Sequence, residues 1–284
     1  MPAGFDQGAR ITMMFFSLAG IFLYLVATVL LGLDLTSEAS PGKGRAIRAG
    51  VIVAAAVGAV LHGAALYRMV LADAGPNLGF FTVASLVAWG IVLVLLMGAI
   101  ARPLANLGIL VLPLAATMAA MALIYPGRHV LSAGMGAGVA IHVVISILAA
   151  SVLGIAAFQT VFLAFQERSL RRKRLGNVLW IFPPLTTQES ILFQLIGFGF
   201  FLLSLSLVSG MAFLNDMLAQ HLTHKTVLSL LAWAMFAVLL WGRWRFGWRG
   251  RKAIRWSLAG FSMLMLAYFG SKLVLEVILG RAWY

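Results

Sequence analysis

Cysteine is absent from this sequence, and acidic residues are scarce. Without cysteine the chain can form no disulfide bond, thiolate metal site or thiol-based active site, and it cannot hold a cofactor covalently through a local Cys-x-x-Cys-His motif. Asp and Glu contribute only 8 of the 284 residues, which is too few for a carboxylate-based proton or cation pathway through a membrane. Only Glu276 falls inside a predicted span, and Lys272 one helical turn before it predicts a structural ion pair.

Charge of either sign is low, and apolar residues take its place. Charged residues make up 10% of the chain and hydrophobic residues 62%, with a mean hydropathy of +1.02, whereas an average soluble domain has roughly 25% charged residues. A soluble fold of this length cannot bury so much apolar surface, so a compact soluble enzyme is excluded and no enzymatic activity is expected. We expect an all-α, polytopic membrane helical bundle that forms a single membrane domain over residues 1–284.

Eight apolar runs between helix breakers predict the transmembrane helices. The runs are continuous and do not alternate with polar residues, which favours helices over a barrel. No small-residue cleavage site follows the first run, so we expect it to be retained as a helix. The fifth is longer than a bilayer requires and should continue as a helix to Arg168. The predicted spans are 12–33, 49–71, 80–100, 103–124, 134–165, 188–214, 226–242 and 253–278.

Lysine and arginine are distributed unevenly between the loops on the two sides of these spans. Of 21 such residues, 15 lie in alternate loops, which the positive-inside rule assigns to the cytoplasm. Both termini are then expected to face outward. Interleaved aromatics make two of these loops resemble nucleic-acid patches, but the alternation favours contact with the lipid bilayer and its anionic head groups, and no nucleic-acid partner is expected. The 15 residues are Lys43, Arg45, Arg48, Arg102, Arg168, Arg171, Arg172, Lys173, Arg174, Arg243, Arg245, Arg249, Arg251, Lys252 and Arg255.

Two of the five histidines, His62 and His142, are predicted to lie inside spans. At 1.5 Å per residue both lie roughly 12–14 Å below the outer surface. Small residues spaced four apart precede each of them, which would let a flat macrocycle approach the backbone, and neutral imidazole is a natural axial ligand of haem iron. Such stripes are equally how membrane helices pack, with each imidazole bonded to a hydroxyl or carbonyl across the seam. Two histidines without a thiolate or carboxylate nearby do not make a zinc site.

Several stretches share their order and spacing with a known family. They are Ile141–Ser146, Phe158–Gln166, His224–Trp233, Gly247–Lys252, Ala267–Gly270 and, more weakly, Leu61–Ser85. These stretches resemble the cytochrome c assembly family of the CcsA/CcmC haem-handling type, and within it the short YpjD-like branch of inner-membrane proteins. The resemblance implies a multi-pass protein of the bacterial inner (cytoplasmic) membrane related to cytochrome c biogenesis factors.

Three features of the haem-transferring members of that family are missing. The outward loop Asn215–Thr226 has no Trp where those members carry a Trp-rich signature. A second outward histidine should fall near Leu279, and a further one near Leu239–Arg243 at the end of the seventh span, but neither is there. Haem presentation to an apocytochrome is therefore not supported, although His142 matches the first histidine of the outward pair.

The matched depth of His62 and His142, strengthened by the resemblance, predicts a b-type haem bound between them near the outer face, with both histidines as metal ligands. The cations best able to meet its propionates are Arg68, Arg128 and Lys272, and the alternative ligands, if the site lies higher, are His129, His221 and His224. The other hypothesis is a haem-free accessory or scaffold subunit that stabilises or regulates another inner-membrane protein. A substrate transporter is a poorer third, because the paired discontinuous helices typical of transporters are not found.

Overall fold

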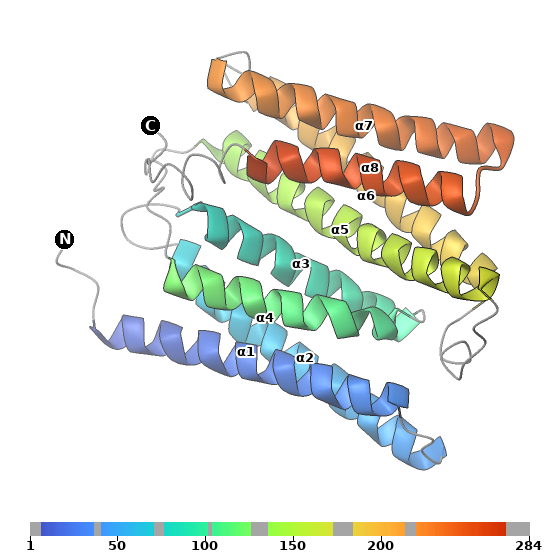
Figure 1. Ribbon diagram of the computed structural model, residues 1–284. Coiled ribbons are helices and arrows are strands. Elements are labelled where there is room, and N and C mark those ends of the chain that lie inside the picture. The colour runs from blue at the N-terminus through green and yellow to red at the C-terminus, as the bar shows by residue number, and fades with distance from the viewer. Residues whose placement is uncertain are drawn as a thin grey trace. The chain divides into compact units, whose positions relative to one another are not determined.

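The computed structural model describes residues 7–36, 41–70, 77–101, 104–125, 136–172, 184–213 and 220–270. Eight helices within these ranges are long and apolar enough to cross a membrane, which confirms the predicted all-α polytopic bundle. They are α1 (Gln7–Thr36), α2 (Pro41–Val70), α3 (Phe80–Ala101), α4 (Gly108–Ile124), α5 (Ala137–Arg171), α6 (Leu185–Phe213), α7 (Gln220–Phe246) and α8 (Arg251–Met265) (Figure 1). A 3₁₀ turn, η1 (Ala105–Leu107), precedes α4, and a π turn, η3 (Leu266–Gly270), continues α8.

The long fifth helix is confirmed as well. α5 runs for 35 residues and ends at Arg171, so it continues past the apolar run as predicted. At 1.5 Å per residue it is about 52 Å long, well beyond the roughly 30 Å of the hydrocarbon core. Part of α5 must therefore extend beyond the apolar part of the bilayer, and its last turn, with Arg168 and Arg171, is the basic end suited to that position.

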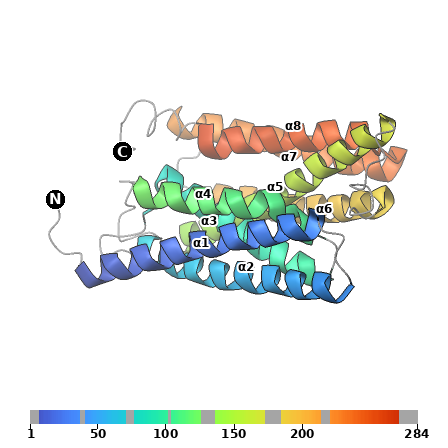
Figure 2. The ribbon, with the colours of Figure 1, turned by 60° about the horizontal axis from the view of Figure 1, so that its bottom comes forward.

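The chain forms two compact units, Met1–Gly134 and Met135–Tyr284, each with four of the long helices. In the first unit α1 packs along α2 and against α4, while α3 packs against α4 (Figures 1 and 2). α1 and α2 meet backbone to backbone, because a Cβ added at Gly20 would lie 3.3 Å from the Gly58 carbonyl oxygen. That residues 1–284 form a single membrane domain stays a prediction.

The second unit is built on α5, which packs against both α6 and α8, and α8 also packs against α7. Its core contains Leu153 from α5, Leu192 from α6, Phe236 from α7 and Leu264 from α8, all almost fully buried. Large apolar side chains elsewhere in this unit, such as Phe201 and Val208, are more than half exposed, as expected of surfaces that face lipid.

The connection between α7 and α8 reverses the chain in four residues. Gly247 and Gly250 have φ values of +62° and +54°, a region in which side chains other than glycine are strained. The reversal is fixed by Glu189 of α6, which accepts a 2.7 Å bond from Arg249 Nε and a 3.0 Å bond from the Gly250 amide. The start of α8 is thereby held close to α5 and α6.

Candidate functional site

His62 lies in α2 inside the first unit and is almost completely enclosed. The histidine is only 2% exposed, and both of its ring nitrogens have hydrogen-bond partners. Nε2 lies 2.8 Å from the hydroxyl of Ser85 on α3, and Nδ1 lies 3.3 Å from the hydroxyl of Tyr24 on α1. An imidazole in a membrane is stable when its polar atoms are bonded within the protein. His62 thus joins three helices through hydrogen bonds.

The small residues before His62 serve helix packing. A Cβ added at Gly58, one turn before His62, would lie 3.1 Å from the Tyr24 ring. A Cβ added at Gly63, which follows His62 and lies outside the stripe, would lie 2.9 Å from the indole of Trp89. The indole nitrogen of Trp89 also donates a 2.8 Å bond to the Ala59 carbonyl of α2. Side chains of neighbouring helices therefore fill the space beside these small residues, as expected if the stripe serves helix packing.

His142 lies in the second turn of α5 in the second unit, and its environment is different. The residue is half-buried, and its Nδ1 lies 3.0 Å from the backbone carbonyl oxygen of Ser206 and 3.1 Å from the Ser209 hydroxyl, both on α6. A carbonyl oxygen can only accept, so Nδ1 carries the proton and donates it there. In the neutral ring Nε2 then has a lone pair and no proton.

The Nε2 atom of His142 has only a weak neighbour among the described residues. The Ser146 hydroxyl lies 3.5 Å away, at the outer limit of a hydrogen bond. That hydroxyl is engaged more closely elsewhere, at 2.7 Å from the His142 carbonyl oxygen and 2.6 Å from the Ser206 hydroxyl. Behind it, the Tyr268 hydroxyl donates a 3.2 Å bond to the Ser146 carbonyl. The polar cluster thus orients the ring and leaves the Nε2 lone pair without a strong hydrogen bond among the described residues.

Only some of the other predicted site residues lie within the part of the chain that the structure describes. Arg68 is exposed in the last turn of α2, and Gly138, one turn before His142, packs against the Phe213 ring. His221 and His224 fall in the first turns of α7. Arg128, His129, Lys272 and Glu276 lie outside the described residues. The two histidines of the predicted pair belong to different units.

Sequence reasoning anticipated hydroxyl or carbonyl partners for the histidines without identifying them. The partners lie 23 to 67 residues away along the chain, and the only signal for them is the presence of polar residues within apolar helices, such as Ser85, Ser206 and Ser209. Within the described part of the chain, no group of three or more His, Asp or Glu side chains could hold a metal ion. A metal that brings its own equatorial ligands, as haem iron does, needs only one or two protein ligands.

Known proteins share much of this sequence. Residues 51–279 match the family model described as Cytochrome C assembly protein. The chain is 34% identical over 233 residues to Inner membrane protein YpjD of Escherichia coli, which covers 80% of this chain and 87% of that protein. It is 33% identical over 189 residues to a 28.8 kDa protein of Azospirillum brasilense, with 65% and 70% covered. Cytochrome c biogenesis protein CcsA of Synechocystis is 28% identical over 100 residues, with 34% and 30% covered. No solved structure matches the chain.

Proposed function

The chain belongs to the cytochrome c assembly protein family, and from this premise we propose that it handles b-type haem, with His142 as a ligand of the iron. It is a multi-pass protein of the bacterial inner membrane, as its spans and its similarity to YpjD indicate. The missing Trp-rich signature and histidines keep haem presentation to an apocytochrome out of the proposal. The proposed activity is storage of haem, passage of haem, or electron transfer through the bound haem.

The observation that carries the proposal is the bonding of the His142 ring. Histidines that bind metals typically donate the second ring N–H to a carbonyl or carboxylate, which fixes the tautomer and makes the ligating nitrogen more basic. His142 has this arrangement, with Nδ1 directed at the Ser206 carbonyl oxygen and Nε2 weakly engaged. When bound, the haem would supply an iron centre able to accept an axial nitrogen and to change its oxidation state by one electron.

The predicted pairing of His62 with His142 requires more of the protein than ligation by His142 alone. To reach an iron, the His62 ring would have to give up its bond to Ser85 or to Tyr24 and leave its enclosed position. We therefore place His142 first, and His62 as a second ligand stays a prediction. Arg68, Arg128 and Lys272 stay the predicted partners of the propionates, since an arginine fork or a lysine ammonium pairs well with a carboxylate.

The basic loops have a separate role in the proposal. The arginines at the end of α5 and around the start of α8 would contact anionic head groups on the side that the charge distribution assigns to the cytoplasm. Trp241 and Trp244, which are 58% and 76% exposed at the end of α7, suit an interfacial position there. A partner protein in the inner membrane also stays a prediction, and no particular surface on the described residues is assigned to it.

Haem recovery with the purified protein tests the function. The protein would be made in haem-replete cells, purified in mild detergent, and assayed for a Soret band and for pyridine haemochrome. We expect haem with the wild-type chain and a haem-to-protein ratio at least about tenfold lower in His142→Ala, because the iron loses its axial ligand. Ser204→Ala, which removes a hydroxyl of α6 that bonds Phe200 and Trp233 and not His142, is the matched control.

Two results would contradict the proposal. A wild-type preparation without haem would favour the haem-free accessory subunit, especially if another membrane protein co-purified with it. Equal haem in the wild type and in a correctly folded His142→Ala variant would show that another residue provides the ligand.

A further inference from the structure

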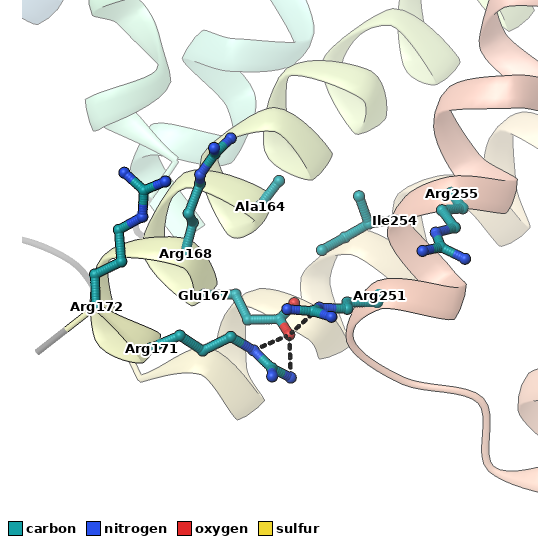
Figure 3. Close-up of a pocket in the computed structure, with 8 residues that line it drawn as sticks. All are labelled: Ala164, Glu167, Arg168, Arg171, Arg172, Arg251, Ile254 and Arg255. Atoms are coloured by element: carbon teal, nitrogen blue, oxygen red, sulfur yellow. Dashed lines mark hydrogen bonds and ion pairs between the residues drawn. The ribbon is translucent and has the colours of Figure 1, made fainter.

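A cleft lined by arginines opens between the end of α5 and the start of α8, within the second unit (Figure 3). Its volume is about 480 Å³, large enough for a small organic ligand or a head group. The charged residues lining it are five arginines and one glutamate, a formal excess of four positive charges. They are Arg168, Arg171, Arg172, Arg251, Arg255 and Glu167.

Two of the five arginines form ion pairs with the glutamate. Glu167 Oε1 accepts bonds of 3.1 and 3.0 Å from Nε and Nη2 of Arg171, one turn later on α5. The same oxygen lies 3.8 Å from Nε of Arg251, the first residue of α8. One carboxylate therefore ties the two helices together at one side of the cleft, and its charge is used there (Figure 3).

The other three arginines have no ion pair with any of the residues that the structure describes. Arg168 lies in the last turn of α5 and Arg172 directly follows that helix, while Arg255 lies on the α8 side of the cleft, one turn after Arg251 (Figure 3). Like charges on facing walls repel one another unless an anion lies between them. Guanidinium groups in such a cleft favour a phosphate, whose oxygens match the planar fork of N–H donors.

Two of the side chains that line the cleft are apolar. Ala164, one turn before Arg168 on α5, and Ile254, which directly precedes Arg255 on α8, point into the space between the two helices (Figure 3). Farther along the same two helices, the hydroxyls of Thr160 and Ser257 bond across the seam at 2.9 Å and close it. The cleft thus presents arginines on both helices and two apolar side chains between them, which matches a ligand with a phosphate and an acyl chain.

We propose that this cleft is a discrete binding site for the phosphate of an anionic phospholipid. Arg168, Arg172 and Arg255 contact the phosphate, while the first methylenes of the lipid lie against Ala164 and Ile254. Basic pockets between transmembrane helices at the cytoplasmic side are known to hold head groups of this class. The inference rests on the proposed contact of the basic loops with anionic lipid, and is independent of haem. The inference adds, to the general attraction between the basic loops and anionic lipid, one binding site that holds one lipid.

Native mass spectrometry of the purified protein with defined lipids tests the site. The wild-type chain would be exchanged into detergent containing phosphatidylglycerol or phosphatidylcholine, and retained lipid would be counted. We expect one tightly held phosphatidylglycerol and no retained phosphatidylcholine. The double variant Arg168→Gln/Arg255→Gln, which removes one arginine from each wall, should bind phosphatidylglycerol at least about tenfold more weakly, since two charge-assisted contacts are lost.

A matched variant separates a discrete site from general charge. Arg45→Gln/Arg245→Gln removes two exposed arginines that do not line the cleft but belong to the same set of cytoplasmic loops. It should keep the wild-type stoichiometry. Equal loss in both double variants would overturn the discrete site while leaving diffuse contact intact, and no preference for phosphatidylglycerol in the wild type would overturn both.

Two further measurements separate phospholipid recognition from misfolding of the variant and from binding of a free anion. Arg168→Lys/Arg255→Lys keeps the charge and loses the planar forks, so a folded variant with intermediate retention supports phosphate recognition even if the glutamine variant fails to fold. Millimolar inorganic phosphate should not displace the lipid from the wild type. Displacement would show that a free phosphate anion is the ligand and would overturn the assignment to a phospholipid.

Discussion

The two intramembrane histidines have the same predicted depth and are held by their units in opposite ways. In the first unit, His62 is 2% exposed and bonded at both ring nitrogens. In the second, His142 is half-buried, with one nitrogen fixed by a backbone carbonyl and the other weakly engaged. The difference separates a histidine whose two ring nitrogens are both bonded within the protein from one whose Nε2 has only a weak hydrogen-bond neighbour. We interpret His62 in its enclosed position as a structural residue and His142 as a functional one.

Removal of the enclosed imidazole should have the largest effect on stability. His62→Ala leaves a cavity among three helices and removes the bonding partners of Tyr24 and Ser85, which we expect to lower the free energy of unfolding by about 2–4 kcal/mol. Reversible denaturant unfolding in detergent measures it. Tyr67→Ala, which removes an aromatic ring that is 64% exposed on the same helix, should cost less than about 1 kcal/mol. Similar losses in both variants would contradict the structural role of His62.

Crowding of the same helix contact should have an intermediate effect. Gly58→Ala places a methyl 3.1 Å from the Tyr24 ring, and we expect a loss of about 1–3 kcal/mol from overpacking. Gly197→Ala in α6 is the matched control, because nothing lies within 4 Å of its new Cβ, and alanine should stabilise that helix by up to about 1 kcal/mol. Thermal unfolding of both variants compares them. A neutral Gly58→Ala would mean that the α1–α2 seam has room for a methyl group.

The smallest effect is expected at the hydroxyl beside His142. Ser209→Ala removes one of two acceptors near Nδ1 and leaves the Ser206 carbonyl in place. Haem affinity should fall by about two- to tenfold, the worth of one hydrogen bond, with little change in stability. Haem titration of the apoprotein measures it. A loss as great as that of His142→Ala would show that the hydroxyl, and not the carbonyl, orients the ring.

The fold could be predicted from the sequence more completely than the sites. Long apolar runs and alternating basic loops predict eight helices, because burial in lipid requires them. The identity of each histidine's partners could not be predicted, since Tyr24 and Ser206 lie 38 and 64 residues away from the rings they bond. Which of them meet depends on how each helix is rotated about its axis, and a helix apolar on every side carries little information about rotation.

The cleft at the end of α5 illustrates the same limit. The basic residues of its loops can be read from the sequence, and their number predicts contact with anionic lipid head groups. The sequence does not show that Glu167 engages Arg171 and Arg251 while leaving Arg168 and Arg255 opposite one another. That division depends on the short reversal before α8, fixed by Glu189 and two glycines in the left-handed region.

Chemical rescue of a His142→Gly variant tests the role of the His142 ring most directly. The variant, purified from haem-replete cells, would be titrated with haem in the presence and absence of free imidazole, and the Soret band recorded. If His142 supplies the ligand through Nε2, the variant alone binds haem poorly and added imidazole restores a wild-type-like spectrum. A wild-type spectrum in the folded variant without imidazole would contradict ligation by His142.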